Sequence, residues 1–196
     1  MSPTSLTLCY ISNASNIGAF TPPEPRADWD CALVIQNPED IAWRGAGMIS
    51  LLQRDDVEID EVESVDPLVA LNRAVILARG EYLVFGNNNS NFRVEGLESA
   101  IEILDGNQHL SALATRILNS DESPIRDYYA EVGELTNSET SGLLLSELVI
   151  RKSTIQSLGT WFSKAEGIDS GELLVVELMK NGAKVGYSPV VTSVLK

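Results

Sequence analysis

The amino-acid sequence predicts an α/β protein in which helices cover both faces of a mostly parallel central sheet, a three-layer α/β/α arrangement. Apolar, β-rich runs alternate with helix-like segments along the chain. Two of these runs, "DCALVI" (30–35) and "EYLVF" (81–85), are short and mostly apolar, as expected for strands that are covered on both faces. Alternation of this kind is typical of parallel strands joined by crossover helices.

The first half of the chain supplies strand, strand, helix, strand, helix and strand in that order. These segments are residues 5–11, 30–35, 37–54, 57–62, 66–79 and 81–85. Asn37 and Asp66 each precede a proline, so both are expected to be helix N-caps with proline at the first helical position. The run at 57–62, "VEIDEV", alternates apolar and acidic residues and predicts a strand with one solvent-exposed face. Gly80 is expected to end the second helix in the left-handed conformation.

The second half begins with a helical stripe of Val94, Leu97, Ile101 and Leu104, closed by Gly106. Strands are expected at 109–118, 143–150 and 184–195, and capping boxes at Ser153-x-x-Gln156 and Asp169-x-x-Glu172 begin two further helices, the second ended by Gly182. Residues 119–142 are polar and aperiodic, which predicts a long surface loop or lid. Residues 1–196 are expected to form a single domain.

Composition narrows the classes of partner. The chain has 28 acidic and 14 basic residues and a net charge of −14, and only Arg151 and Lys152 are adjacent bases, so nucleic acid is an unfavourable partner.

No apolar stretch approaches the roughly 20 residues of a membrane helix. The first apolar run has no basic residue before it, which does not fit a signal peptide. Cys9 and Cys31 are expected to be buried free thiols, and a cytoplasmic location follows.

Several familiar motifs are absent from the sequence. There is no G-x-x-x-x-G-K-[ST] loop and no G-x-G-x-x-G after the first strand. Two cysteines and one histidine, far apart, do not make a zinc site. His109 is the only histidine and carries no signature of a nucleophile elbow, so a surface or structural role is expected.

One stretch of the sequence carries a more specific pattern. "ALNRAVILARGEYLVFGNNNSNFRVEGLESAIEIL" (70–104) has Ala70, Asn72, Ile76, Ala78, Gly80, Glu81, Tyr82 and Phe85 at the spacing of A-R-N-x-G-I-x-x-A-x-G-E-Y-I-x-F-L-D-x-D-D. This pattern resembles the core of the family-two glycosyltransferases with the GT-A fold. Two later stretches, "LVIRKSTIQSLGTWF" (148–162) and "ELMKNGAKVGYSPVV" (177–191), resemble the end of the same family.

The resemblance implies a GT-A-like domain with a nucleotide-diphosphate-sugar site at the carboxyl ends of the first strands. The family's D-x-D motif falls on Asn87 and Asn89, and its next acid falls on Ser90. Neutral amides are poor ligands for Mg²⁺ or Mn²⁺, which prefer carboxylate and phosphate oxygens. The sequence therefore requires no metal cofactor, and a divalent ion stays an alternative.

Other family motifs are also altered. The family's first-strand P-T-x-N motif is altered, since "YISNASN" has no proline, and Gln36 and Asn37 stand where acids would bind the base and ribose. The family's general-base acids fall on Ser170 and Gly171, with their arginine partner on Glu177. Asp169 and Glu172 lie close by and are the candidate catalytic acids, unless they only form the capping box. The candidate nucleotide-sugar contacts are Ser12, Asn13, Asn37, Asn72, Arg73, Asn87, Asn88, Asn89, Arg93, Arg151 and Lys152, of which the bases would neutralise the diphosphate.

The resemblance implies transfer of a sugar from a nucleotide-diphosphate sugar to a glycan or other acceptor, as in polysaccharide biosynthesis, without a D-x-D metal. The alternative is a degenerate GT-A-like domain that binds a nucleotide, sugar or protein without transfer, since amides hydrogen-bond hydroxyl and peptide groups without a cation. A third interpretation is a subunit of a homo- or hetero-oligomer, in which Trp29, Trp161 and Phe162 face a partner or lie in the core.

Overall fold

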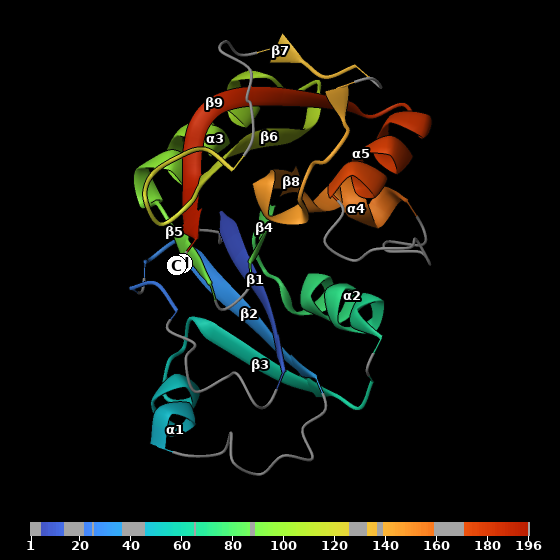
Figure 1. Cartoon of the computed structure of the whole chain (residues 1–196). Helices are drawn as coiled ribbons and strands as arrows, with labels where there is room; N and C mark the ends of the chain where they lie inside the picture. The colour runs from blue at the N-terminus through green and yellow to red at the C-terminus, as the bar shows by residue number, and fades with distance from the viewer. Residues whose placement is uncertain are drawn as a thin grey trace. The chain divides into compact units, whose positions relative to one another are not determined.

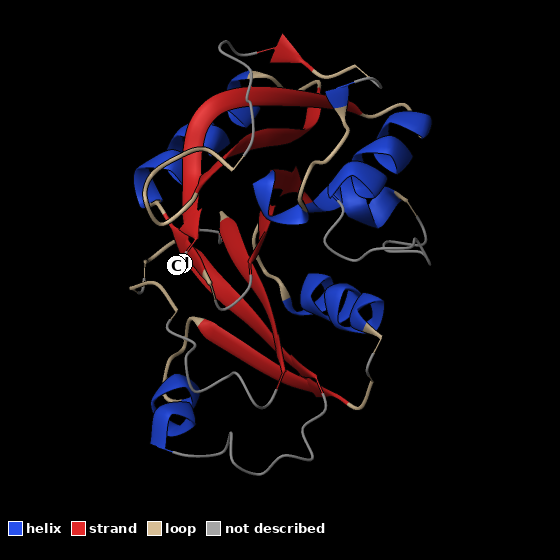
Figure 2. Ribbon diagram, viewed as in Figure 1, coloured by secondary structure: helices blue, strands red, loops and turns tan. Residues whose placement is uncertain are grey.

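The computed structural model describes residues 5–13, 22–24, 26–36, 46–64, 66–86, 89–125, 133–136, 139–158 and 171–195. The described residues fall into two compact units, an N-terminal unit before Asn89 and a C-terminal unit from Asn89 onward. Each unit contains strands and helices, as Figure 2 shows by colour. The single domain expected for residues 1–196 stays a prediction.

The N-terminal unit is built on four parallel strands in the order β3, β2, β1, β4. Their bounds are β1 (Leu6–Asn13), β2 (Trp29–Gln36), β3 (Val57–Val62) and β4 (Tyr82–Gly86). Every residue of β2 is buried, which agrees with the continuous apolar run predicted there. Trp29 is 7% exposed, so its indole belongs to the core; Trp161 and Phe162 lie outside the described residues.

Two helices belong to this unit. Helix α2 (Pro67–Leu77) packs on β1, β2 and β3 through Ala70, Leu71, Ala74 and Val75 (Figure 1). The predicted N-cap is confirmed, because the Asp66 carboxylate accepts the Leu68 N–H. Helix α1 (Ala46–Leu52) forms the end of the helix predicted at 37–54, whose beginning lies outside the described residues.

Gly80 is not the left-handed residue that we predicted. Helix α2 ends at Leu77 with Ala78 as its C-cap, and Gly80 has no positive φ. A Cβ at this position would lie 2.6 Å from the Leu6 carbonyl carbon and from the Thr7 nitrogen. Glycine is needed here because the chain passes directly over the backbone of β1.

The amino ends of β1 and β2 hold a buried polar cluster. Thr7 Oγ1 donates to Asp30 Oδ1 and accepts the Gly80 N–H at 2.8 Å, and Asp30 Oδ2 accepts the Arg79 N–H at 3.2 Å. Burial raises the pKa of Asp30, against the opposing effect of these hydrogen bonds. The cluster joins β1, β2 and the connection from α2 to β4.

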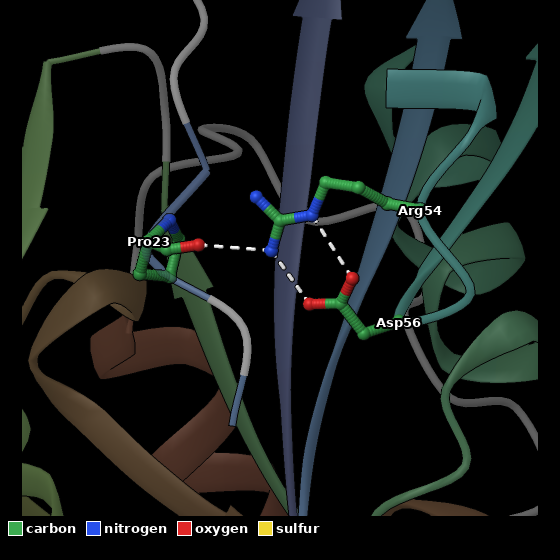
Figure 3. Close-up of polar contacts among 3 residues, drawn as sticks. All are labelled: Pro23, Arg54 and Asp56. Carbon is green, nitrogen blue, oxygen red and sulfur yellow. Dashed lines mark hydrogen bonds and ion pairs between the residues drawn. The ribbon is translucent and has the colours of Figure 1, made fainter. Parts of the chain in front are cut away.

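An ion pair fixes the entry to β3. Arg54 Nε and Nη2 donate to the two carboxylate oxygens of Asp56 at 2.9 and 2.6 Å, and Nη2 also donates to the Pro23 carbonyl oxygen at 2.9 Å (Figure 3). The hydrogen bond from Arg54 lowers the pKa of Asp56. One guanidinium therefore holds the short segment 22–24 against the turn that begins β3.

The C-terminal unit has a mixed sheet with strand order β8, β6, β9, β5 and with β7 also on β9. The strands are β5 (Ser90–Phe92), β6 (Leu110–Leu118), β7 (Gly133–Glu134), β8 (Leu148–Arg151) and β9 (Lys184–Leu195). Only β6 and β9 pair in parallel; the other described pairs are antiparallel. Figure 1 shows β9 as a long curved strand, and its register against β6 shifts between Ala114–Tyr187 and Arg116–Val191.

Helix α3 (Val94–Gly106) buries Leu97, Ala100 and Leu104 and packs on β6 and β9. Helix α5 (Gly171–Lys180) buries Leu174, Val175 and Leu178 and is followed by Gly182 at φ +82°, the left-handed residue that we predicted. In helix α4 (Lys152–Ser157) the N-cap is Arg151, without a side-chain capping bond, so the predicted Ser153 capping box is wrong.

Two further expectations are corrected. The strand predicted at 143–150 is shorter, because Leu145–Glu147 form the 3₁₀ turn η4 before β8 begins. The Glu147 carboxylate accepts the Leu144 N–H at 2.6 Å, which bends the chain at this point. The predicted loop at 119–142 is not wholly a surface segment: β7 pairs with β9, and Leu135 is buried with its N–H on the Val185 carbonyl oxygen.

The two thiols are free and buried, as predicted. Cys31 is the register partner of Leu8 and Cys9 is that of Ala32, so the two side chains lie on opposite faces of the sheet. His109 is half-exposed with Nε2 3.3 Å from Glu134 Oε1, which confirms a surface position. Among the described helices, none is long and apolar enough to cross a membrane.

Candidate functional site

The carboxyl edge of the N-terminal unit gathers several of the predicted contacts. Strands β1 and β2 end at register partners, Asn13 and Gln36. Ser12 is buried at 4% exposure one residue earlier. Strand β4 ends at Gly86, the register partner of Tyr10 on β1, and Gly86 precedes the three asparagines in the sequence. Because all four strands are parallel, these polar residues meet at the edge where ligands of open α/β sheets bind.

Gln36 has a defined role at this edge. Its side chain is 7% exposed, and Nε2 donates to the Ser64 carbonyl oxygen at 3.2 Å. The amide therefore holds the connection between β3 and α2 against the end of β2. Asn37, the next residue and a predicted nucleotide contact, lies outside the described residues, as do Asn87 and Asn88.

The two predicted contacts on α2 have protein partners. Asn72 Nδ2 donates to the Leu68 carbonyl oxygen at 2.8 Å, one turn earlier in the helix. Arg73 forms an ion pair with Asp60 on β3. The first bond lies within α2 and the second joins α2 to β3, so both side chains have a structural role.

In the C-terminal unit, Asn89 is an exposed turn residue and Ser90 is buried at the start of β5. Arg93 is the N-cap of α3, with its N–H on the Thr192 carbonyl oxygen at 2.8 Å. Its guanidinium pairs with Glu122 at 2.8 Å, and the two side chains are 42% and 70% exposed. Glu122 sits in a turn at φ 63°, an unusual conformation for a residue with a side chain.

Arg151 is committed to the backbone of its own unit. The residue is 8% exposed, and its guanidinium donates to the Leu104 carbonyl oxygen at 2.6 Å and to that of Leu110 at 3.0 Å. Leu104 lies in the last turn of α3, where a cation also complements the helix dipole. Arg151 thus stabilises the end of α3, and Lys152 is half-buried as the first residue of α4.

The start of α5, where the resemblance places the general base, is closely packed. Gly171 is buried, and a Cβ there would lie 2.3 Å from the Leu144 carbonyl oxygen. The Glu172 N–H donates to the Leu143 carbonyl oxygen at 3.0 Å, and Glu172 Oε2 accepts the Gly142 N–H at 2.9 Å. Asp169, the other predicted acid, lies outside the described residues.

Comparison with solved structures gives matches over nearly the whole chain. The first 349 residues of S. aureus TarS match with a TM-score of 0.77 and 13% identity, over 98% of this chain and 60% of that one. The same TarS fragment in complex with UDP-GlcNAc gives a TM-score of 0.73 at 14% identity, over 97% and 58% of the two chains. Its complex with UDP gives 0.69 at 14% identity, over 97% and 60%.

The chain has a GT-A-like fold. The α/β class with a central sheet that the sequence predicted is therefore confirmed. No model of a known protein family matches the chain, and no curated protein matches it. The chain spans about 60% of the TarS fragment and 36% of the longer TarS chain.

The residues at the expected metal position do not fit a divalent ion. Residues 87–90 are three asparagines and a serine, which offer amide and hydroxyl oxygens and no carboxylate. Mg²⁺ and Mn²⁺ prefer carboxylate and phosphate oxygens. Elsewhere in the described part of the chain, no group of three or more His, Cys, Asp or Glu side chains is placed to hold a metal ion.

Two features of the GT-A-like fold were missed by reading the sequence. The contact between Gly171 and Leu144 was not expected, although the glycine itself was an available signal, since glycine permits a close approach of two backbones. The polar cluster of Thr7 and Asp30 was also missed. A threonine and an aspartate inside apolar strand runs were the available signal, because buried polar groups need partners.

Proposed function

We propose that this chain is a glycosyltransferase-type domain that binds a uridine-diphosphate sugar and transfers the sugar to an acceptor without a metal bound by D-x-D. The observation that carries the proposal is the GT-A-like fold, which covers 98% of the chain and is shared with TarS, of which crystal complexes with UDP-GlcNAc and UDP exist. The asparagines at 87–89 motivate the absence of the metal.

The nucleoside is expected to bind at the carboxyl edge of β1 and β2. Ser12, Asn13 and Asn37 are the proposed contacts, because hydroxyl and amide groups hydrogen-bond the uracil and ribose without a cation. Asn87, Asn88 and Asn89 are proposed to contact the sugar hydroxyls in the same manner. Asn72 and Arg73 are less favoured, since both side chains already have partners within the N-terminal unit.

The diphosphate needs positive charge, because the chain as a whole is strongly acidic. Among the proposed bases of the C-terminal unit, Arg93 is the most available. Its ion pair with Glu122 is exposed, and such pairs contribute only about 0–1 kcal/mol. A diphosphate carries more charge than one carboxylate and would displace Glu122. Lys152 stays a second proposed contact, whereas Arg151 is held by two carbonyl oxygens.

The test is the release of nucleoside diphosphate from a panel of UDP- and GDP-sugars, each measured with Mn²⁺ and with EDTA. We expect turnover of a UDP-sugar at the same rate in both conditions. Asn13→Ala should raise the KM for the donor about tenfold, the cost of one or two hydrogen bonds. The matched control is Asn181→Ala, at the exposed end of α5, which should change nothing. Turnover that needs Mn²⁺ would contradict the proposal.

A second candidate function is binding of a nucleotide sugar or a protein partner without transfer. The start of α5 favours it, because Gly171 has no room for an acid and Glu172 is bonded to Gly142. Binding of UDP by calorimetry with no detectable turnover across the panel would indicate this candidate. The absence of both binding and turnover would leave a scaffold or a subunit of an oligomer.

A further inference from the structure

The amino end of α5 is joined to residues 142–147 by contacts that leave no free space. A Cβ on Gly171 would lie 2.3 Å from the Leu144 carbonyl oxygen, 2.5 Å from its carbonyl carbon and 2.9 Å from the Leu145 nitrogen. Distances below 3.0 Å essentially never occur for a real Cβ. All three atoms belong to the backbone, so they cannot rotate away as the end of a flexible side chain could.

Glu172 adds two hydrogen bonds from α5 to residues 142–147, one through its backbone and one through its carboxylate. Its N–H donates to the Leu143 carbonyl oxygen at 3.0 Å, and its Oε2 accepts the Gly142 N–H at 2.9 Å. A hydrogen bond to an ionised acceptor is about twice as strong as a neutral one. A carboxylate in the first turn of a helix is also favoured by the helix dipole.

Residues 142–147 are shaped to receive these bonds. Gly142 has φ +73°, a left-handed conformation that glycine adopts without cost. The flanking Leu143 and Leu145 are buried, at 1% and 7% exposure. The Glu147 carboxylate accepts the Leu144 N–H, so two glutamates hold N–H groups of this short stretch.

From these contacts we propose that Glu172 is a positioning residue, which fastens residues 142–147 to α5, and that it is not the proton acceptor in sugar transfer. A general base must direct its carboxylate at the acceptor hydroxyl, whereas one carboxylate oxygen of Glu172, Oε2, is directed at the Gly142 N–H. An acid restored at position 171 would clash with the Leu144 backbone. Only the statement about proton transfer rests on the proposed function; the positioning role stands on the geometry alone.

The positioning role is tested by hydrogen exchange of the Gly142 amide in the full chain, measured by NMR. Glu172→Ala removes the acceptor, and we expect this amide to exchange at least about tenfold faster. Glu172→Gln keeps an oxygen at the same place and should stay within about threefold of the wild type. The control is Glu177→Gln in the same helix, where the carboxylate pairs with Lys180 and accepts a hydrogen bond from Asn181. Unchanged exchange in Glu172→Ala would overturn the proposal.

The second arm measures transfer of sugar in the same variants. We expect Glu172→Gln to retain the wild-type turnover and its pH profile, because the hydrogen bond to Gly142 is preserved. A loss of more than about 100-fold in Glu172→Gln, with the Gly142 amide still protected, would show that Glu172 is the base after all. If the wild type shows no turnover, the proposed transferase function fails, and the exchange result alone decides the positioning role.

Gly171→Ala provides an independent check of the joint. The added Cβ should force residues 144–145 away from α5, lower the melting temperature and expose the Gly142 amide to exchange. A variant as stable and as protected as the wild type would contradict the close approach of Leu144. Because Glu172→Ala adds no atoms, it still reports on the joint if Gly171→Ala fails to fold.

Discussion

At the scale of single residues, the buried hydroxyl of Thr7 joins two buried polar groups of the N-terminal unit. It is 0% exposed and links Asp30 of the neighbouring strand to the Gly80 N–H. Both partners are polar groups for which water is not available. Removing the hydroxyl therefore leaves a buried carboxylate with one bond fewer and a buried N–H with none, and each loss is costly.

Thr7→Val is expected to lower the free energy of unfolding by about 2–4 kcal/mol, measured by urea denaturation. Thr7→Ser, which keeps the hydroxyl, should cost less than about 1 kcal/mol. Burial raises the pKa of Asp30 and the Thr7 bond opposes it, so the pKa should rise further in Thr7→Val. The penalty should then be smaller near pH 4 than at pH 7, because a protonated Asp30 needs the bond less. A penalty below 0.5 kcal/mol at pH 7, on the order of a surface substitution, would contradict this account.

A second prediction at this scale concerns the Arg54–Asp56 pair. The hydrogen bond from Arg54 lowers the pKa of Asp56 in the folded state. A lowered pKa contributes stability above the pKa of the unfolded chain, and this stability is lost as pH falls through the lower, folded value. Wild type should therefore be more stable than Asp56→Asn at pH 6, and the difference should shrink below about pH 4. Asp55→Asn, at an exposed neighbour, is the matched control for the loss of one acid in this turn.

At the scale of elements, helix α3 contains one glycine that is required by a close backbone contact and one that is not. A Cβ on Gly96 would lie 1.9 Å from the Val191 carbonyl oxygen, because the helix meets β9 at that turn. Gly106 ends the same helix and has no atom within 4 Å of the position of a Cβ. The two glycines occupy one helix, Gly96 in its first turn and Gly106 at its end, and they differ in the space around them.

Gly96→Ala should destabilise the protein by more than about 2 kcal/mol, since either α3 or β9 must move. Gly106→Ala should be neutral or stabilise by up to about 1 kcal/mol, because alanine favours the helix. Thermal and urea unfolding of both variants give the comparison directly. Equal effects of the two substitutions would mean that α3 does not approach β9 as closely as described.

Local signals in the sequence predicted those elements whose causes are local. The strand at 57–62 has the predicted bounds, and Asp66 caps α2 as expected, because alternation and capping depend on residues near in sequence. Gly80 and the turn at Leu145–Glu147 were misjudged because their geometry depends on β1 and on a buried carboxylate that folds back on the chain. Tertiary contact of this kind leaves no period in the sequence.

The candidate site was predicted less completely. The family resemblance implied a site at the carboxyl ends of the first strands; Ser12 and Asn13 end β1, and their contact with a ligand stays a prediction. The roles of Arg151 and Glu172 could not be predicted, because a base or acid in the sequence does not reveal a backbone partner 30 to 47 residues away. Asn37, Asn87, Asn88 and Asp169 lie outside the described residues and stay predictions.

At the scale of the whole molecule, the fold and the residues of the candidate site support different conclusions about function. The GT-A-like fold matches TarS over nearly all of the chain, and TarS has been crystallised with UDP-GlcNAc. Residues 87–90, where the sequence resemblance would place a metal motif, carry amides and a hydroxyl, and Gly171, where it would place a general base, lies against the Leu144 backbone. The proposed binding of a uridine nucleotide without a metal would reconcile the two, because hydrogen bonds from amides and bases do not require a cation.

Calorimetric titration of UDP into the full chain tests this claim most directly. We predict binding with a dissociation constant that differs by less than about threefold between 1 mM EDTA and 1 mM Mn²⁺, a difference on the order of 0.6 kcal/mol. Binding that appears only with Mn²⁺, or tightens by about 100-fold when it is added, would show that residues 87–90 hold a metal and would contradict the account.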